Sequence, residues 1–149
     1  MKKNQIRTVL LALKTIRMPM IKDKDIRAAL IKIHFFLLGQ SKKLEADMDD
    51  IRAVHLGAYE DELRAVYELY ARMKAESDQD KKNALYEEIN GHTELLAAMN
   101  AFYKANAEKE EEAIELPCLI NGEKFVEEYG KQDYDPSVVE ALYPLFDIG

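Results

Sequence analysis

The sequence predicts a mainly α-helical fold, an elongated antiparallel bundle of two long helices with a small C-terminal cap. Apolar residues recur every three or four positions through two long stretches, which is the helical period. The composition is that of a folded domain, with 48% hydrophobic and 33% charged residues. Six Gly and four Pro in 149 residues favour long elements with few turns. We expect a single domain, with a body over about 1–113 and a cap over about 114–149.

The first long helix is predicted over residues 23–56. Asp23 is a suitable N-cap and Gly57 a suitable stop. Within it, residues 33–38 are apolar almost all round, so this segment needs cover on more than one side. Gly39 follows as a kink or as a place of close approach. The apolar stripe consists of Ile26, Leu30, Ile33, Leu37, Leu44, Met48, Ile51 and His55.

Three further helices are predicted before the cap. The first covers residues 4–17, with a strand over Val9–Leu13 as the alternative. The next covers 59–76, and the last runs from about 81 to 113 with a coiled-coil-like repeat. The apolar seam of this last helix consists of Leu85, Ile89, His92, Leu96, Met99 and Tyr103.

The length of the two long helices predicts an elongated molecule. Each has about 33 residues, or roughly 50 Å at the helical rise. A compact domain of this size has a radius of gyration of only about 15 Å. We therefore expect the two helices to run antiparallel, with the helix over 59–76 in the connection between them.

The C-terminal cap has its own local signals. Residues 114–120 contain β-forming residues around Pro117, which predicts an extended segment or a short edge strand. A short helix over 123–129 is expected to end at Gly130. Asp135 followed by Pro136 is an N-cap with proline at the first helical position, and predicts a last helix over 138–146.

The net charge of −7 conceals an uneven distribution. Residues 1–45 carry eleven Lys/Arg and three Asp/Glu, and residues 46–149 carry ten and twenty-five. Either the basic third pairs with the acidic remainder, which we favour, or it contacts an external anion. Under the second interpretation the chain binds nucleic acid, and the candidate contacts are Arg7, Lys14, Arg17, Lys24 and Arg27.

Signals for enzymatic chemistry are weak. Acidic pairs such as Glu45 and Asp49 fit a helical Mg²⁺-dependent nucleotide hydrolase as a second alternative. These acids lie mostly outside the apolar stripes, where solvated faces belong, and the sequence has no glycine-rich phosphate loop. Three scattered histidines and the single Cys118 do not form a zinc pattern. We expect no enzyme activity, no cofactor and no metal.

Protein association is therefore the expected function. The candidate interface is the all-round apolar segment, Ile33, Phe35, Phe36, Leu37 and Leu38, and a homo-oligomer or a protein partner is expected. One cysteine excludes an internal disulfide, and the apolar run Thr8–Leu13 is too short for a signal peptide. No run is long enough to span a membrane. These features predict a cytoplasmic protein.

The order of these elements resembles small helical phage and prophage proteins of unknown function. The resemblance is one of pattern and rests on three segments. These are Asp25 to Arg52, with Gln40-Ser41-Lys42-Lys43-Leu44 between its apolar and acidic parts, Ile114-Glu115-Leu116, and Tyr134-Asp135-Pro136 through Phe146. The resemblance implies a phage accessory or structural role and assigns no functional residue.

Overall fold

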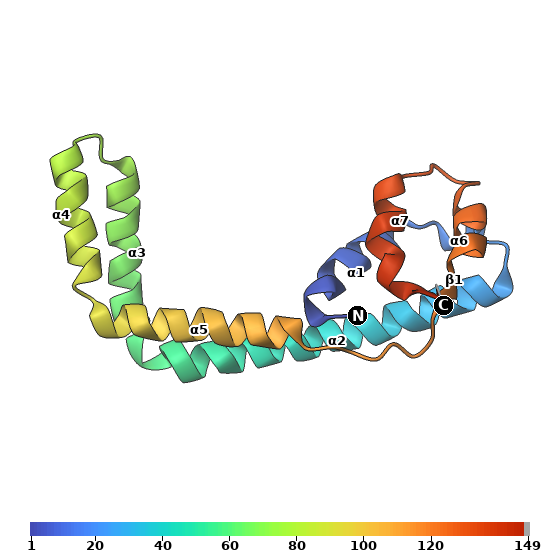
Figure 1. The fold of residues 1–149 in the computed structure, drawn as a ribbon, viewed down its shortest axis with the longest axis horizontal. Coiled ribbons are helices and arrows are strands. Elements are labelled where there is room, and N and C mark those ends of the chain that lie inside the picture. The colour runs from blue at the N-terminus through green and yellow to red at the C-terminus, as the bar shows by residue number, and fades with distance from the viewer. Residues whose placement is uncertain (148–149) are drawn as a thin grey trace. The chain divides into compact units, whose positions relative to one another are not determined.

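The computed structural model describes residues 1–147 and confirms the mainly α fold class (Figure 1). Its contacts divide the chain into two compact units. Unit 1 contains residues 1–46 and the chain from Lys109 onward, and unit 2 contains residues 47–108. These boundaries differ from the predicted body and cap, because the cap packs with the N-terminal part of the chain.

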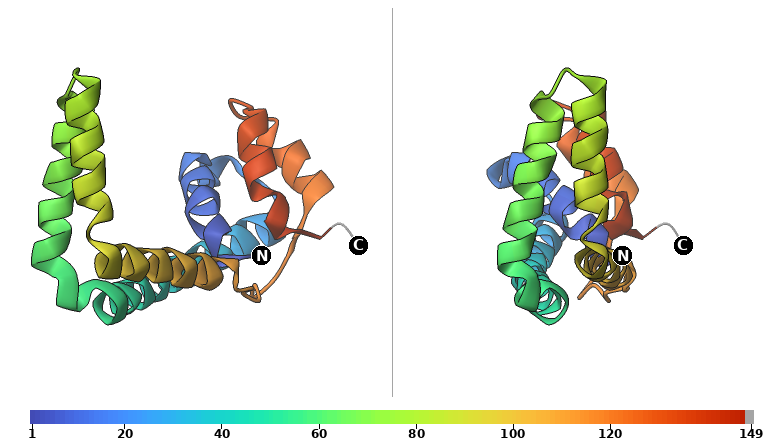
Figure 2. Two further views of the ribbon diagram at one scale, coloured as in Figure 1. Left: turned by 60° about the vertical axis from the view of Figure 1, so that its left-hand side comes forward. Right: turned by 90° about the vertical axis from the view of Figure 1, so that its left-hand side faces the viewer.

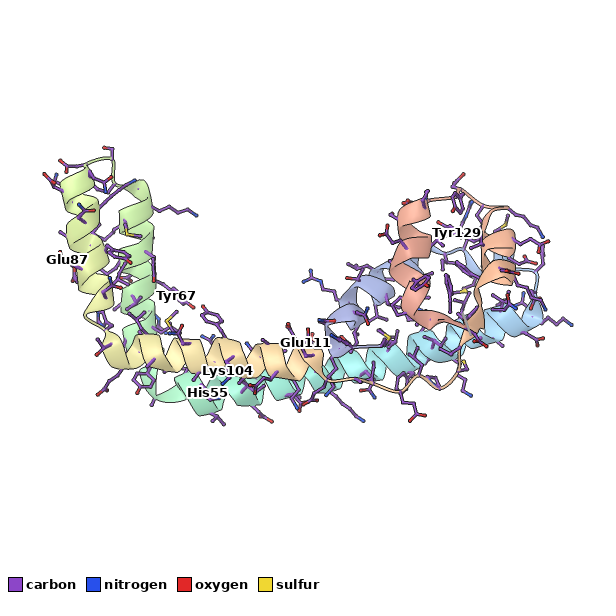
Figure 3. The ribbon with its side chains drawn as sticks, in the orientation of Figure 1. His55, Tyr67, Glu87, Lys104, Glu111 and Tyr129 are labelled. Atoms are coloured by element: carbon purple, nitrogen blue, oxygen red, sulfur yellow. The ribbon has the colours of Figure 1, made fainter. Side chains whose placement is uncertain are left out.

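Unit 1 has one apolar core to which segments distant in sequence contribute. It contains α1 (Ile6–Thr15), the first part of α2 (Lys24–Leu56), α6 (Gly122–Tyr129) and α7 (Pro136–Leu142). Phe125 of α6 is fully buried and its ring stacks on that of Tyr129, the last residue of α6, which lies on the side of this helix that faces α7 (Figure 3). Short 3₁₀ turns lie before α1 at Lys3–Gln5, between α1 and α2 at Met18–Met20, and after α7 at Tyr143–Leu145.

The cap contains the short strand that was one of the sequence alternatives. β1 (Ile120–Asn121) pairs in parallel with β2 (Phe146–Asp147), and Ile120 is in register with Phe146. The strand alternative for Val9–Leu13 is wrong, since these residues lie in α1.

The predicted caps form as expected. Asp23 Oδ1 accepts hydrogen bonds from the backbone N–H groups of Asp25 and Ile26, and Asp135 accepts one from Ser137. Proline fixes φ at the first residue of α7.

Inside unit 1, the basic N-terminal segment pairs with the acidic end of α5 (Thr93–Glu111) and the residues that follow it. The backbone N–H of Lys3 donates to Glu112 O (3.0 Å), and that of Ile114 donates to Met1 O (2.8 Å). Lys2 and Lys3 form ion pairs with Glu111 and Glu112. Residues 1–46 carry a net charge of +8 and residues 109–149 one of −8, so the charges of the sequence that makes up unit 1 cancel. These contacts favour internal pairing of the basic third.

Unit 2 is built on a helical hairpin. α3 (Glu60–Ala75) and α4 (Gln79–Asn90) lie side by side (Figure 2), and Asp78 caps α4 by accepting from the backbone N–H groups of Asp80 and Lys81. A 3₁₀ turn at Gly57–Tyr59 precedes α3. The unit's core consists of Leu56, Leu63, Val66, Leu69, Leu85, Ile89, Leu95 and Met99.

The predicted helix over 81–113 is wrong as a single element. It is divided into α4 and α5 (Thr93–Glu111), with Gly91 and His92 between them. The backbone N–H of His92 donates to Ile89 O, while His92 O accepts from Leu96, so His92 is where the new helix begins.

The division changes which residues of the seam are buried. Leu95 is buried and its neighbour Leu96 only partly, and Tyr103 is exposed whereas Phe102 packs against the core. After the break the buried seam therefore contains Leu95, whereas the sequence repeat predicted Leu96 at this point.

Candidate interaction surface

The part of α2 that belongs to unit 1 has a buried face of regular helical spacing. Ile26, Leu30, Ile33 and Leu37 follow one another at steps of four, three and four residues, and each is buried in the unit 1 core. This face attaches the helix to α1, α6 and α7 through the shared core, so the direction of its other face is fixed by packing.

The opposite face of the same helical segment exposes three large apolar side chains. Phe35 is 72% exposed, Ile31 42% and Leu38 40%. Their spacing of four and three residues places them within about 60° of one another around the helix axis, at 3.6 residues per turn. They form one stripe, which we call the α2 stripe.

The five residues of the predicted interface do not lie on one face of α2. Ile33 and Leu37 are core residues with no exposed surface, so their assignment to an interface is wrong. Phe36 is partly buried against the same core. Phe35 and Leu38 are exposed, as an interface requires.

Ile31 is the residue that the sequence prediction of this surface omitted. A helical projection detects it, because Ile31 lies four positions before Phe35 and hence on the same side of the helix. The prediction treated residues 33–38 as one block and did not separate the two faces of the helix.

Small and charged residues surround the α2 stripe. Ala28 and Gly39 lie beside it, and a Cβ built on Gly39 would meet no atom within 4 Å among the described residues. Exposed Lys24 lies two turns before Ile31 on the same side of the helix, and exposed Lys42 and Glu45 lie one and two turns after Leu38. The stripe is therefore a narrow apolar strip with a lysine toward each end and a glutamate beyond one of them.

The five candidate nucleic-acid contacts are not all free to bind an external anion, since some of them have partners within the chain. Arg17 Nη2 lies 3.5 Å from Asp133 Oδ2, and Arg27 Nη1 donates to Ile21 O at 3.3 Å. Arg7 and Lys14 are exposed on α1, and Lys24 is exposed at the start of α2. Two of the five side chains thus have acceptors within the chain.

The acidic residues considered for Mg²⁺ are not gathered into a site. Within residues 1–147, no group of three or more His, Cys, Asp or Glu side chains is placed to hold a metal ion. Two further acids, Glu111 and Glu112, form ion pairs with lysines. Hydrogen bonds from Lys3 and then Lys109 lower the pKa of the Glu112 carboxyl. Cys118 is a half-buried free thiol packed against the unit 1 core.

A shallow groove lies between α6, α7 and β2 in unit 1, and no pattern in the sequence predicted it. Its volume is about 890 Å³, and exposed Val126 and Tyr143 are among its lining residues. Gly122 lies at its edge, where an added Cβ would come within 3.2 Å of the Phe146 ring. The close approach of this ring accounts for the glycine, and Glu123 and Asp147 are the charged residues of the lining.

The fold and the α2 stripe define a mainly α protein with an exposed apolar strip on one helix. Comparison with known proteins adds no family, since no family model, curated protein or solved structure matches the chain. No helix within the described residues has the length and apolar character needed to cross a membrane.

Proposed function

We propose that this protein is a non-enzymatic assembly protein whose copies associate through the α2 stripe. The supporting observation is the exposure of Phe35 between the half-exposed Ile31 and Leu38. Clusters of large apolar side chains on a surface mark interaction sites, and aromatic residues at their centre contribute most to binding. Single scattered apolar residues, such as Leu11 of α1, carry no such implication.

The rigidity of α2 supports the proposal. The helix continues without interruption through Gly39, and four buried residues attach it to the core. A surface held in this way loses little conformational entropy on binding. The proposed role agrees with the structural or accessory role implied by the resemblance to helical phage proteins. We also propose a cytoplasmic location, supported by the single cysteine, which leaves no internal disulfide.

Light scattering coupled to size-exclusion chromatography tests the proposal. We expect the mass of the unmodified protein to rise with concentration above the 17.1 kDa of one chain. Phe35→Lys should keep the circular dichroism spectrum and lose the association, because a charge would be buried in the contact. Leu11→Lys, at an exposed leucine outside the stripe, is the matched control and should associate normally. A wild-type mass of one chain at every concentration would remove the proposal.

A further inference from the structure

A groove lies between α3 and α4, at the end of the hairpin where the connecting loop joins the two helices. Its lining consists of Tyr70, Met73, Lys74, Gln79, Lys82, Asn83 and Tyr86. Both helices contribute, and both pack on the core of unit 2, so the groove is formed within one unit. Its volume is about 610 Å³, which is within the range of sites for small ligands.

The charged residues of this lining are both lysines. Lys74 is exposed and Lys82 is partly buried. Within the described part of the chain, neither has a carboxylate at ion-pair distance. The carboxylates of the connecting loop are bound to backbone instead, since Glu76 and Asp78 accept hydrogen bonds from N–H groups of the loop and of α4. The groove is therefore suited to an anionic group.

Acidic residues outside the groove limit the strength of this attraction. Residues 47–108 carry seven Lys/Arg and fourteen Asp/Glu. On α4, exposed Asp80 and Glu87 lie about 140–160° around the helix axis from Lys82. At physiological ionic strength exposed charges are screened beyond about 8 Å, so the lysines of the lining act mainly on a group inside the groove. We therefore expect weak binding that needs a second kind of contact.

Two tyrosines, one from each helix, provide that second contact. Tyr70 is 38% exposed and Tyr86 is 57% exposed. Among residues 1–147, neither ring contacts another aromatic ring and neither hydroxyl group has a hydrogen-bond partner. Gln79 Nε2 donates to Asn83 Oδ1 (2.9 Å), and both amides are exposed. Proteins bind unpaired bases by stacking them on aromatic rings and by hydrogen bonding to their edges.

We infer that this groove binds a nucleotide, whose base stacks on Tyr86 and whose phosphate pairs with Lys82, one turn earlier on the same side of α4. An acidic peptide would use the lysines but would leave the tyrosine rings and the amide pair unused. A free mononucleotide and a single strand of nucleic acid offer the same chemistry, and the experiment distinguishes them. The inference goes beyond the proposed function and is independent of the α2 stripe, which lies in unit 1.

NMR titration of the isotope-labelled chain tests the inference, with AMP and with a single-stranded oligonucleotide of about six adenosines as probes. We expect shifts of backbone amides between residues 70 and 86, with a dissociation constant in the millimolar range for AMP. Similar affinities for the two probes would identify a free nucleotide as the ligand, and an oligonucleotide that binds at least about tenfold more tightly would identify a strand. Shifts confined to other parts of the chain, or no shifts with either probe, would overturn the inference.

Substitutions in the groove test the two contacts separately. Tyr86→Ser should weaken binding about tenfold because the stacked base loses its partner, whereas Tyr86→Phe keeps the ring and should bind almost normally. Tyr103→Ser, at a similarly exposed tyrosine of α5, is the control. Lys82→Gln should weaken binding, and Lys81→Gln, at the neighbouring lysine outside the lining, should not.

A glutamate peptide of the same net charge as the oligonucleotide tests whether charge alone is recognised. We expect it to bind at least about tenfold more weakly than the nucleotide probes, because it cannot stack on Tyr86. A peptide that binds as tightly as the oligonucleotide would overturn the inference in favour of an acidic peptide. Unchanged binding of AMP to the Tyr86→Ser variant would overturn it as well.

Discussion

His92 Nδ1 lies 2.7 Å from Glu62 Oε1, so the residue at the junction of α4 and α5 is bound directly to α3. Both side chains are partly exposed. The contact joins the two ends of the hairpin in unit 2 at the point where the helix break occurs. It therefore attaches the junction of α4 and α5 to α3.

Glu62→Ala should destabilise unit 2 by about 1 kcal/mol, because a partly exposed charge-assisted hydrogen bond contributes on that order. Urea unfolding followed by circular dichroism measures the change. Glu68→Ala, at an exposed glutamate on the same helix, is the control and should change stability by less than about 0.5 kcal/mol. Equal effects of the two substitutions would show that the contact with His92 contributes nothing.

Two adjacent leucines test the two faces of α2. Leu37 is fully buried, so Leu37→Ala should lower the free energy of unfolding by about 2–5 kcal/mol. Leu38 is 40% exposed, so Leu38→Ala should have a much smaller effect on unfolding and should instead weaken self-association. Denaturant unfolding and light scattering on the same two variants give both readouts. If Leu38→Ala lowered the free energy of unfolding strongly and Leu37→Ala weakened only self-association, the two faces of α2 would be wrongly assigned.

The pairing of Glu112 with Lys3 and Lys109 predicts a pH effect. Hydrogen bonds from these lysines lower the folded-state pKa of Glu112. A group with a depressed folded pKa stabilises the protein above its unfolded pKa, about 4.3 for Glu, and loses this contribution as the pH falls through the folded value. Lys3→Gln should raise the pKa of Glu112 in an NMR titration. An unchanged titration curve would contradict the pairing.

Asp135 should stabilise the start of α7, and Asp135→Ala should cost about 1 kcal/mol, the usual value for the loss of an N-cap. Asp135→Asn is the matched variant, since asparagine caps a helix equally well, and it should retain most of the stability. Thermal unfolding of both variants measures the difference. If both variants lose the same amount of stability, loss of the cap hydrogen bond between Ser137 and Asp135 is not the cause of the destabilisation.

Local signals predicted most of the elements because their causes are local. The caps at Asp23 and Asp135 depend on a few neighbouring residues, and each forms where it was predicted. α2 also ends at Leu56 as predicted, although Gly57 continues into a 3₁₀ turn and does not adopt the left-handed conformation of a glycine stop. The period of apolar residues likewise identified α2 over nearly its full length.

What the sequence could not predict depends on contacts between distant segments. The seam through Leu96 and the seam through Leu95 are both apolar, so periodicity alone could not choose between them, and packing into the unit 2 core decides. The core that joins Phe125 to the N-terminal helices cannot be read from either segment alone. For the same reason Ile33 and Leu37 were assigned to the candidate surface, although the cap covers that side of α2.

Sedimentation equilibrium of the unmodified protein over a concentration range from about 1 to several hundred micromolar tests the central claim most directly. The data should fit a reversible equilibrium between the single chain and its oligomers. A single species with the mass of one chain throughout that range would contradict self-association through Ile31, Phe35 and Leu38.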